Sequence, residues 1–517
     1  MRDRWNRTPK ALLVTALVVL ICGVVAILTH ELNVGYGDDY ALYIRQARSL
    51  LDGDVARVIN DNAYTVTAKG QATPEFSPMV YPWVTSLLMV PFVRLFGHTN
   101  FADLRLAEVV FLCVWVVAFM VLLRRRVPLA AAAVITLCVA VNVQYAAHTN
   151  SVLSEIPYLM MATLLFVLID HVQQRHHPLR LPWATAWSVG IMGCLVFNTR
   201  REALAILPAF AVWQAAAWWR GSAAEPRSEG EARDAITKAA GRPYLTFAAS
   251  TFLFHLMLPS TLVPSYEGSS VTNSFGNLIG GYRRKLGEVL GFEWVPTLLV
   301  VVVLVLAVLG AVQRLRNNDD VFFLTFVGIS TFLVAGHRVI ITRYLMLAIP
   351  FLLYLAYHGW VWLIGRVATR ATKRVVFGLL PTLGILGTTL LVTVEKIDDV
   401  QTRRSNGVYE LGPGSFPEDA GFDAVRALTS ADDVVAFFKA RLMTLLTDRR
   451  SVQTAEREVI LSEADYYLQR YDQFEPPTEG FSPFLGVPQF DEQQAAEAGL
   501  VEVWRNDRWV LWKVPQP

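Results

Sequence analysis

The sequence predicts an α-helical polytopic membrane protein with about eleven transmembrane helices and a small α/β domain at its C-terminal end. Of the 517 residues, 54% are hydrophobic and only 17% are charged, whereas about a quarter of a soluble domain is charged. The charge is absent from repeated runs of roughly 17 to 22 residues, the length that a helix needs to cross a bilayer. These runs stop near residue 393. We therefore divide the chain into a membrane domain, 1–393, and a C-terminal domain, 394–517.

The first hydrophobic run, 11–29, follows four basic residues at the start of the chain. A signal peptide has the same order, but this run is longer than a usual signal core and ends without a small-x-small cleavage pattern. We interpret it as an uncleaved membrane anchor, with a cleaved signal peptide as the alternative. The remaining helices are predicted by ten further apolar runs, 104–123, 127–146, 156–171, 183–198, 203–219, 244–262, 295–312, 321–336, 345–364 and 375–393.

Basic residues are distributed unevenly between the loops of these predicted helices. Cytoplasmic loops of membrane proteins carry an excess of Lys and Arg. With the N-terminus in the cytoplasm, the cluster 124–126, the linker 220–243 and the basic residues of 366–374 all lie inside. The opposite orientation puts nearly every basic cluster outside. We therefore predict a multi-pass protein of the cytoplasmic (inner) membrane, with its N-terminus inside and its C-terminal domain extracytoplasmic.

One apolar segment, 81–97, does not fit this series of spans, because it is short and contains Pro82, Pro91 and Arg94. Counting it as a span would invert every later loop and break the charge pattern. We predict an interfacial or re-entrant helix on the outer side. It belongs to a long first external loop, 30–103.

The C-terminal domain alternates short strand and helix patterns. Strand patterns occur at 432–438 and 450–455, and helical patterns occur at 439–448 and 490–500. The last stretch, VEVWRNDRWVLWKV, predicts a hairpin that turns at its Asn-Asp pair. These alternations predict a small α/β domain, in which we identify no catalytic constellation.

The four cysteines, Cys22, Cys113, Cys138 and Cys194, all lie inside apolar runs. None has a partner at metal-ligand spacing, so we interpret them as small buried hydrophobic residues. They give no indication of the compartment.

Acidic residues occur where two of the predicted helices reach the outer face. Asp38 and Asp39 follow the first span, and two adjacent carboxylates at a membrane surface repel each other unless they meet a cation, a metal or a substrate hydroxyl. Glu155 follows the third span, close to His148. A turn or a helix cap is the structural alternative for all three acids. The residues alone leave both interpretations open.

Arginines also occur on the predicted outer face, against the charge bias. They form two groups: Arg200 and Arg201 with Glu202, and Arg338 and Arg343 with Tyr344. A guanidinium can donate two parallel hydrogen bonds to a phosphate. Binding of a lipid phosphate would therefore explain why arginines occur on the outer face. Interfacial snorkelling, or ion pairing with Glu202, is the alternative. We favour phosphate binding for Arg201 and Arg343.

All of these residues lie on the outer face under the predicted topology, so their carboxylates and guanidiniums could meet in one cavity. Transfer from a lipid phosphate to a hydroxyl needs this combination. Cations stabilise the leaving phosphate, and a carboxylate takes the proton of the acceptor.

Six stretches of the chain carry a resemblance through their order and their place in the topology. They are GDDYALYIRQARSLLDGD, MVYPWVTSLLMVPFVRLFG, VLSEIPYLMMATLLF, NTRREALAILPAF, TRYLMLAIPFLLYLA and FFKARLMTLLTDRRSVQ. The first is similar to the acidic pair and the A-R-x-L-x-x-G run of the GT-C superfamily of integral-membrane glycosyltransferases. The second is similar to that family's Tyr/Pro-led juxtamembrane helix, and the last resembles its C-terminal domain. The chain most resembles the branch of bacterial aminoarabinose transferases and protein O-mannosyltransferases.

The resemblance implies an inverting glycosyltransferase that moves a sugar from a polyprenyl-phosphate donor, drawn from the membrane lipid, to a hydroxyl of a lipid, glycan or protein acceptor. Asp38 and Asp39 correspond to the family's acidic pair, which supplies the general base. The adjacent-acid pattern favours Asp38, and the spacing to Tyr43 favours Asp39. Arg201 and Arg343 would bind the lipid phosphate.

Together with the outer-face clusters described above, these residues predict a wider substrate-binding set. Its further members are Tyr43, Tyr81, His148, Glu155, Arg200, Glu202, Arg338 and Tyr344. Glu155 stands where this branch usually has an Asp, which leaves a divalent metal open, and no other cofactor is implied. We expect no nucleic-acid partner. The loop 263–294 is expected to close over the site.

Two other classes of function remain as alternatives. A membrane transporter or lipid flippase would keep ionisable residues near the bilayer midplane, whereas the predicted spans here are nearly free of charge. A non-catalytic cell-envelope scaffold would not be affected by loss of the acidic pair. The transferase is the leading hypothesis.

Overall fold

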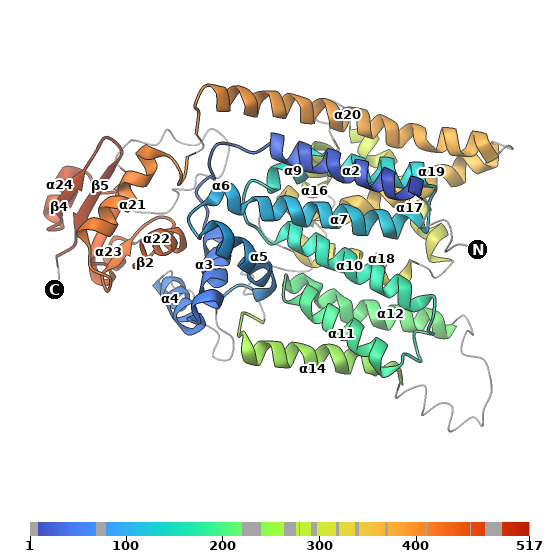
Figure 1. Cartoon of the computed structure of the whole chain (residues 1–517), viewed down its shortest axis with the longest axis horizontal. Helices are drawn as coiled ribbons and strands as arrows, with labels where there is room; N and C mark the ends of the chain where they lie inside the picture. The colour runs from blue at the N-terminus through green and yellow to red at the C-terminus, as the bar shows by residue number, and fades with distance from the viewer. Residues whose placement is uncertain are drawn as a thin grey trace.

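The computed structural model combines a bundle of membrane helices with a small sheet domain (Figure 1). The long helices run side by side, and the C-terminal domain lies at one end of the bundle together with α3 (Asp39–Asp52), α4 (Val55–Ala68) and α5 (Trp83–Phe96). The first described helix, α2 (Pro9–Leu28), begins at the opposite end. The described residues are 9–68, 79–219, 239–262, 274, 276–278, 280–290, 297–316, 320–336, 341–367, 371–409, 411–454, 456–470 and 489–515.

Each of the eleven predicted apolar runs is largely α-helical, and one of them, 127–146, is divided between two α-helices. Within the described ranges, six helical segments are long and apolar enough to cross a membrane, so the chain is a multi-span membrane protein. The helices are α2 (Pro9–Leu28), α7 (Leu106–Arg124), α8 (Leu129–Ala140), α10 (Glu155–Gln173), α11 (Trp183–Phe197), α12 (Ile206–Trp219), α14 (Arg242–Met257), α17 (Thr297–Leu315), α18 (Val321–Ala335), α19 (Ala348–Val367) and α20 (Ala371–Ser405).

The apolar run 127–146 is interrupted in the structure, unlike the single helix that its hydropathy predicts. α8 ends at Ala140, and Asn142 begins a second helix, α9 (Val143–His148). The Asn142 side chain accepts a hydrogen bond of 2.9 Å from the backbone N–H of Gln144 and donates to a distant backbone carbonyl. Asn142 thus supplies a hydrogen-bond acceptor for a free backbone N–H at the start of α9. The residues around it are apolar, so the hydropathy of the run does not reveal the break.

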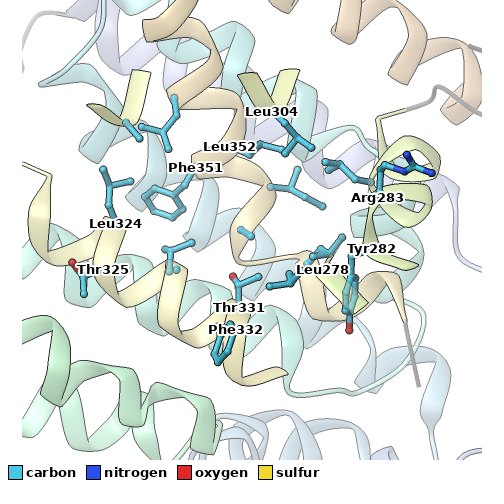
Figure 2. Close-up of a pocket in the computed structure, with 18 of the residues that line it drawn as sticks. Leu278, Tyr282, Arg283, Leu304, Leu324, Thr325, Thr331, Phe332, Phe351 and Leu352 are labelled. Carbon is cyan, nitrogen blue, oxygen red and sulfur yellow. The ribbon is translucent and has the colours of Figure 1, made fainter. Parts of the chain in front are cut away.

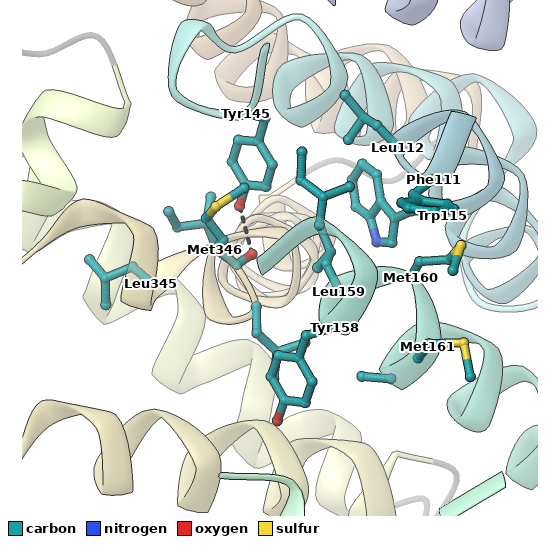
Figure 3. Packing of buried hydrophobic residues seen from close by; sticks show 14 of the residues in the cluster. Phe111, Leu112, Trp115, Tyr145, Tyr158, Leu159, Met160, Met161, Leu345 and Met346 are labelled. Carbon is teal, nitrogen blue, oxygen red and sulfur yellow. Dashed lines mark hydrogen bonds between the residues drawn. The ribbon is translucent and has the colours of Figure 1, made fainter. Parts of the chain in front are cut away.

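Aromatic residues pack in the centre of the bundle, and one of them contacts a segment next to the site described below. The fully buried rings of Trp115 and Tyr145 stack with their centroids 6.2 Å apart. Tyr145 donates its hydroxyl hydrogen to the carbonyl oxygen of Met346 over 2.7 Å, which pairs the buried phenol (Figure 3). The bond ties α9 to the turn that follows the short 3-10 helix η2 (Thr342–Leu345).

Two helices of the bundle approach each other so closely that only glycine fits between them. A Cβ on Gly310 of α17 would lie 2.0 Å from the carbonyl oxygen of Leu355 in α19. A Cβ on Gly359 of α19 would lie 2.0 Å from the carbonyl oxygen of Leu306 in α17. Such close packing is typical of membrane helices with small residues at their interface, because a residue without a side chain lets the two backbones come into contact.

The C-terminal domain is a mixed five-stranded sheet with helices, as the alternating patterns predict. The strand order is β2-β1-β3-β5-β4, with β1 parallel to β2 and β3, and β5 antiparallel to β3 and β4. The β4–β5 pair confirms the predicted hairpin. The elements are α21 (Phe416–Leu428), β1 (Val434–Ala436), α22 (Ala440–Thr447), β2 (Arg450–Val452), α23 (Arg457–Glu463), β3 (Tyr466–Arg470), α24 (Glu492–Glu497), β4 (Val501–Arg505) and β5 (Trp509–Lys513).

The central strand β3 is an element that the sequence analysis did not predict. Its residues, YYLQR, show no apolar alternation, yet Gln469 and Arg470 are buried. Gln469 exchanges two hydrogen bonds with the backbone of Phe490, and Arg470 pairs with the buried Glu418 over 3.3 Å. These partners come from distant parts of the chain, so the strand has no local signal.

The C-terminal domain is docked onto the first external loop by backbone and side-chain contacts. The backbone N–H of Tyr36 donates to the carbonyl oxygen of Leu411 over 3.0 Å, and the Tyr36 hydroxyl donates to Glu418 over 2.5 Å. Gly412 lies against the same loop, where a Cβ would come within 2.1 Å of the Val34 carbonyl oxygen. This docking brings α22 against α3 and fixes one wall of the cavity described next.

Candidate functional site

A polar cavity of about 390 Å³ lies where the external loop, the ends of the membrane helices and the C-terminal domain meet. The segment before α5, the first residue of α10 and the short 3-10 helices η1 (Arg201–Ala205) and η2 contribute to its wall. Most of the predicted site residues are therefore brought together. The lining residues are Asp39, Tyr43, Met79, Val80, Tyr81, Pro82, Ser154, Glu155, Thr199, Arg200, Arg201, Glu202, Thr261, Arg343, Tyr344 and Arg441.

The two adjacent acids face different neighbours. Asp39, the first residue of α3, lines the cavity, where its Oδ1 accepts a hydrogen bond of 2.6 Å from the Tyr81 hydroxyl and its Oδ2 lies 3.6 Å from Nη1 of Arg343. Asp38 is not among the lining residues, and its Oδ1 accepts the backbone N–H of Arg441 over 3.2 Å. Successive positions at a helix start point in directions about 100° apart, which separates the two carboxylates.

Glu155 and Glu202 are joined through a single guanidinium. Nη1 of Arg200 donates to Oε1 of Glu155 over 2.6 Å, and Nη2 of Arg200 lies 3.0 Å from Oε1 of Glu202. Both carboxylates are buried, at 6% exposure. The cation therefore neutralises two acids that burial would otherwise destabilise.

Arg343 of η2 makes longer contacts to the acids of the cavity. Its Nη1 lies 3.6 Å from Asp39, its Nε lies 3.4 Å from Glu155, and a quarter of its side chain is exposed. Nε is buried without a hydrogen-bond partner in the described part of the chain. Because its contacts to the acids are long and part of the side chain is exposed, the guanidinium has the capacity to bind an anion that enters the cavity.

Arg201, for which the sequence analysis favoured phosphate binding, donates mainly to the protein itself. Its Nε donates to the carbonyl oxygen of Thr261 over 2.6 Å, and its Nη2 donates to the hydroxyl of Ser260 over 2.6 Å. Thr261 in turn bonds to the backbone of Val80. Arg201 thus holds the segment after α14 against the segment before α5, and both segments line the cavity.

Tyrosine side chains complete the cavity wall. Tyr43 and Tyr81 lie with their ring centroids 5.0 Å apart, and the guanidiniums of Arg200 and Arg343 lie over the ring of Tyr344. Burial raises the pKa of Tyr81 well above its ordinary value, although the neighbouring Arg441 opposes the shift. The phenol therefore stays protonated and serves as a hydrogen-bond donor to Asp39.

Besides Asp38, His148 is a predicted site residue that does not line the cavity. It ends α9, where its Nδ1 contacts the carbonyl oxygen of Gln144. Arg338 lies outside the described residues. The loop 263–294 lies partly outside them as well, and its described part includes α16 (Gly281–Val289).

Arg441 lines the cavity but is absent from the predicted site, because it belongs to a domain in which no chemistry was recognised. Its Nη1 donates to the Tyr81 hydroxyl over 2.7 Å, and its Nε donates to Asn62 of α4 over 2.8 Å. The available signal was a basic residue inside FFKARLMTLLTDRRSVQ, a stretch that already carried part of the resemblance.

The cavity acids are not arranged as a metal-ligand set. No group of three or more His, Cys, Asp or Glu side chains that could hold a metal occurs in the described ranges. The guanidinium of Arg343 contacts both Asp39 and Glu155, so an arginine takes the position between the two acids. The residues present do not fit a divalent metal bridged by this pair.

An apolar groove of about 550 Å³ runs between α16, α17, α18 and α19 (Figure 2). Phe351, Leu352 and Leu304 line its interior, and Tyr282 and Arg283 lie at one end of the view. A small cavity of about 20 Å³ shares lining residues with both the groove and the polar cavity. The shared residues are Thr331 on the groove side, and Glu155, Arg200, Arg343 and Tyr344 on the polar side.

No family model and no curated protein sequence matches the chain. Among solved structures, ArnT from Cupriavidus metallidurans in the apo state matches with a TM-score of 0.51 and 13% identity, over 96% of this chain and 97% of that one. The same protein bound to undecaprenyl phosphate matches with a TM-score of 0.49 and 12% identity, over 96% and 97% of the two chains. The Archaeoglobus fulgidus oligosaccharyltransferase in complex with Zn and sulfate matches with a TM-score of 0.49 and 12% identity, over 84% and 62%.

The similarity to the apo ArnT structure extends along nearly the whole of both chains, so this protein has an ArnT-like fold. The resemblance to GT-C membrane glycosyltransferases that the sequence predicts is therefore confirmed at the level of the fold. At 13% identity the match shows the fold alone, and the roles of individual residues depend on the geometry described above.

Proposed function

We propose that this protein is an inverting glycosyltransferase that transfers a sugar from a polyprenyl-phosphate donor to a hydroxyl of a lipid, glycan or protein acceptor. The observation that supports it best is the polar cavity, in which a carboxylate, Asp39, and a guanidinium with donors to spare, Arg343, face each other. Acid and cation at this distance fit a transfer in which one group takes a proton while the other stabilises a leaving phosphate.

The donor binds with its phosphate at Arg343 and its polyprenyl tail in the apolar groove. The small cavity adjoins both the groove and the polar cavity, because it shares Thr331 with the groove and Tyr344 with the polar cavity. A lipid phosphate fits this pair of sites, because its anionic head suits the polar cavity and its apolar tail suits the groove. Arg201 keeps the cavity wall in place in this scheme, and its contribution to phosphate binding is secondary.

Asp39 is the general base. It takes the proton of the acceptor hydroxyl, whose oxygen forms a bond to the anomeric carbon while the bond from that carbon to the phosphate oxygen breaks. The electron pair of the broken bond leaves with the phosphate, and Arg343 stabilises the added charge. A single displacement inverts the anomeric carbon and requires no covalent intermediate on the protein.

The membrane arrangement belongs to the same proposal. Eleven helices cross the cytoplasmic membrane, the N-terminus is inside, and the C-terminal domain of residues 394–517 is outside, next to the cavity. The distribution of basic loops supports this orientation. The acceptor then approaches from the extracytoplasmic side, and the donor enters laterally from the lipid.

The test is transfer by the purified protein and its Asp39→Asn variant, with radiolabelled undecaprenyl-phosphate sugars as donors and a membrane extract as acceptor. Asp39→Asn is expected to lower turnover by at least about 100-fold, because an amide cannot take the proton. Asp38→Asn is expected to keep most of the activity, because an amide oxygen can still accept the Arg441 N–H. Release of polyprenyl phosphate and labelling of the acceptor are both measured.

The matched control is Asp52→Asn, which removes an exposed carboxylate from the other end of the same helix α3. It is expected to leave turnover within about twofold of wild type. Wild-type turnover in Asp39→Asn would show that Asp39 is not the base. Absence of polyprenyl phosphate release by the wild type from all such donors would contradict the transferase function itself.

A further inference from the structure

Arg441 connects the C-terminal domain to both members of the acidic pair. It lies in the first turn of α22, and its backbone N–H donates to Oδ1 of Asp38 over 3.2 Å. Its side chain reaches Asp39 through one intermediate, because Nη1 donates to the Tyr81 hydroxyl, which donates to Oδ1 of Asp39. One residue of the C-terminal domain therefore acts on both carboxylates.

The direction of these hydrogen bonds determines which oxygen of Asp39 faces the cavity. Arg441 can only donate, so the Tyr81 oxygen accepts from it, and the single hydroxyl hydrogen of Tyr81 is left to point at Oδ1 of Asp39. Oδ2 is then the oxygen on the side of Arg343. A hydroxyl that accepts from a cation also donates a stronger bond, which holds the carboxylate more firmly.

The guanidinium of Arg441 is itself held in one orientation. Nε donates to Oδ1 of Asn62 over 2.8 Å, and Nη1 donates to the Tyr81 hydroxyl over 2.7 Å. The guanidinium carbon, Cζ, lies 4.8 Å from the centre of the Tyr81 ring. The planar fork of an arginine makes both bonds at once, whereas a lysine ammonium on its flexible stem cannot reproduce this geometry. Arg441, which belongs to α22, thus holds the Tyr81 hydroxyl in a fixed position relative to α4 and α22.

We infer that Arg441 is a positioning residue for the transfer reaction, which orients Tyr81 so that Asp39 presents Oδ2 to the acceptor hydroxyl. The membrane domain supplies the base and the phosphate ligand, and the docked C-terminal domain completes the geometry in which the base works. This inference rests on the proposed function and assigns a role to a domain that the proposed mechanism does not otherwise use.

The docking of the domain does not depend on the Arg441 side chain alone. Arg48 of α3 pairs with Asp448 at the other end of α22 over 2.8 Å, and Arg450 pairs with Asp61 of α4 over 3.2 Å. The hydroxyl of Thr65 also donates to the Ser451 carbonyl oxygen over 2.7 Å. Truncation of the Arg441 side chain therefore removes the link to Tyr81 while these contacts keep the domain in place.

The experiment is a double-mutant cycle on the full-length protein, with Arg441→Met, Tyr81→Phe and the double variant, measured with an undecaprenyl-phosphate sugar as donor. Arg441→Met is expected to lower kcat by about 10- to 100-fold, the usual consequence of a base displaced by a fraction of an ångström to an ångström. The KM for the donor is expected to change less than about twofold, because Arg441 does not bind its phosphate. The double variant is expected to be no slower than the slower single variant, because both changes break one chain of bonds.

Arg441→Lys and Arg450→Met are the accompanying variants. Arg441→Lys keeps the charge without the fork and is expected to restore only part of kcat. Arg450→Met removes a docking ion pair of the same domain outside the cavity and is expected to keep wild-type kcat. Thermal unfolding of each variant in detergent checks that the fold is retained.

Each outcome bears on the inference in a definite way. Multiplicative losses in Arg441→Met and Tyr81→Phe, or an equal loss in Arg450→Met, would overturn the positioning role. Full activity of Arg441→Met beside an active wild type would overturn it and leave the transferase function intact. A wild type that releases no polyprenyl phosphate would remove the proposed function and the positioning role together.

Discussion

Two arginines of the cavity, which share Glu155 as a partner, differ in how closely they contact the cavity's carboxylates. Arg200 pairs at 2.6 and 3.0 Å with two buried acids, and 15% of its side chain is exposed. Arg343 pairs at 3.4 and 3.6 Å and is more exposed. The short buried pairs are characteristic of a structural counter-ion, whereas the longer pairs leave donors for a ligand. Identical residue types therefore make different contacts in one cavity.

Arg200→Met is expected to destabilise the protein strongly. It leaves Glu155 and Glu202 buried without the cation between them, and removal of one partner of a buried ion pair costs about 3–5 kcal/mol. The thermal unfolding temperature in detergent measures the effect. Arg343→Met is the matched control, expected to unfold close to wild type but to lose affinity for undecaprenyl phosphate. Equal unfolding temperatures for the two variants would contradict this division.

Among the helices, the contact of α17 with α19 shapes the apolar groove, because both helices contribute to its lining. Gly310 and Gly359 let the two backbones meet without side chains between them. In lipid such packing depends on van der Waals contact, since the surrounding acyl chains are as apolar as the helix faces. A change in this contact is expected to alter the groove as well as the stability.

Gly310→Ala is expected to lower the unfolding temperature and to weaken binding of undecaprenyl phosphate together. The added methyl group would lie 2.0 Å from the Leu355 carbonyl oxygen, so α19 must move. Thermal unfolding and equilibrium binding of the radiolabelled lipid phosphate measure the two effects. Gly365→Ala in α19 is the control, because no atom lies within 4 Å of its Cβ position. An unaffected Gly310→Ala would mean that the helices adjust without moving the groove.

For the whole molecule, the polar cavity, the helices α3 to α5 and the C-terminal domain lie at one end of the bundle, and α2 begins at the other (Figure 1). The proposed orientation places the first end on the extracytoplasmic side of the cytoplasmic membrane. In that orientation the proposed catalytic residues face the compartment of the proposed acceptor, and the apolar groove lies between helices of the bundle.

Single cysteines at the two ends test the orientation. Ser430→Cys lies on the exposed surface of the C-terminal domain, and Arg175→Cys lies in the exposed loop after α10. A membrane-impermeant maleimide is expected to label Ser430→Cys in intact cells, and Arg175→Cys only after permeabilisation. The reverse pattern would place the C-terminal domain in the cytoplasm. Of the native cysteines, Cys22, Cys138 and Cys194 are buried and Cys113 is partly buried, so wild type provides the background.

The sequence by itself determined the multi-span helical architecture and the small sheet domain. Backbone groups in lipid must pair within their own helix, so a run of apolar residues is enough to predict a helix there. The same reasoning cannot predict the break at Asn142 or the strand β3. Their polar side chains form hydrogen bonds and ion pairs with partners far along the chain. Local patterns predict elements only where the stabilising contacts are local.

The tertiary structure decided which of the predicted residues share the cavity. The sequence left Asp38 and Asp39 as alternatives, and their directions at the start of α3 separate them. Arg441 enters the cavity from more than 350 residues beyond Tyr81, through the docking of the C-terminal domain. Its place depends on the packing of that domain against α3 and α4, which no local pattern in the sequence records. Residue type and order therefore predict the kind of chemistry, and only the packing determines which side chains come within bonding distance.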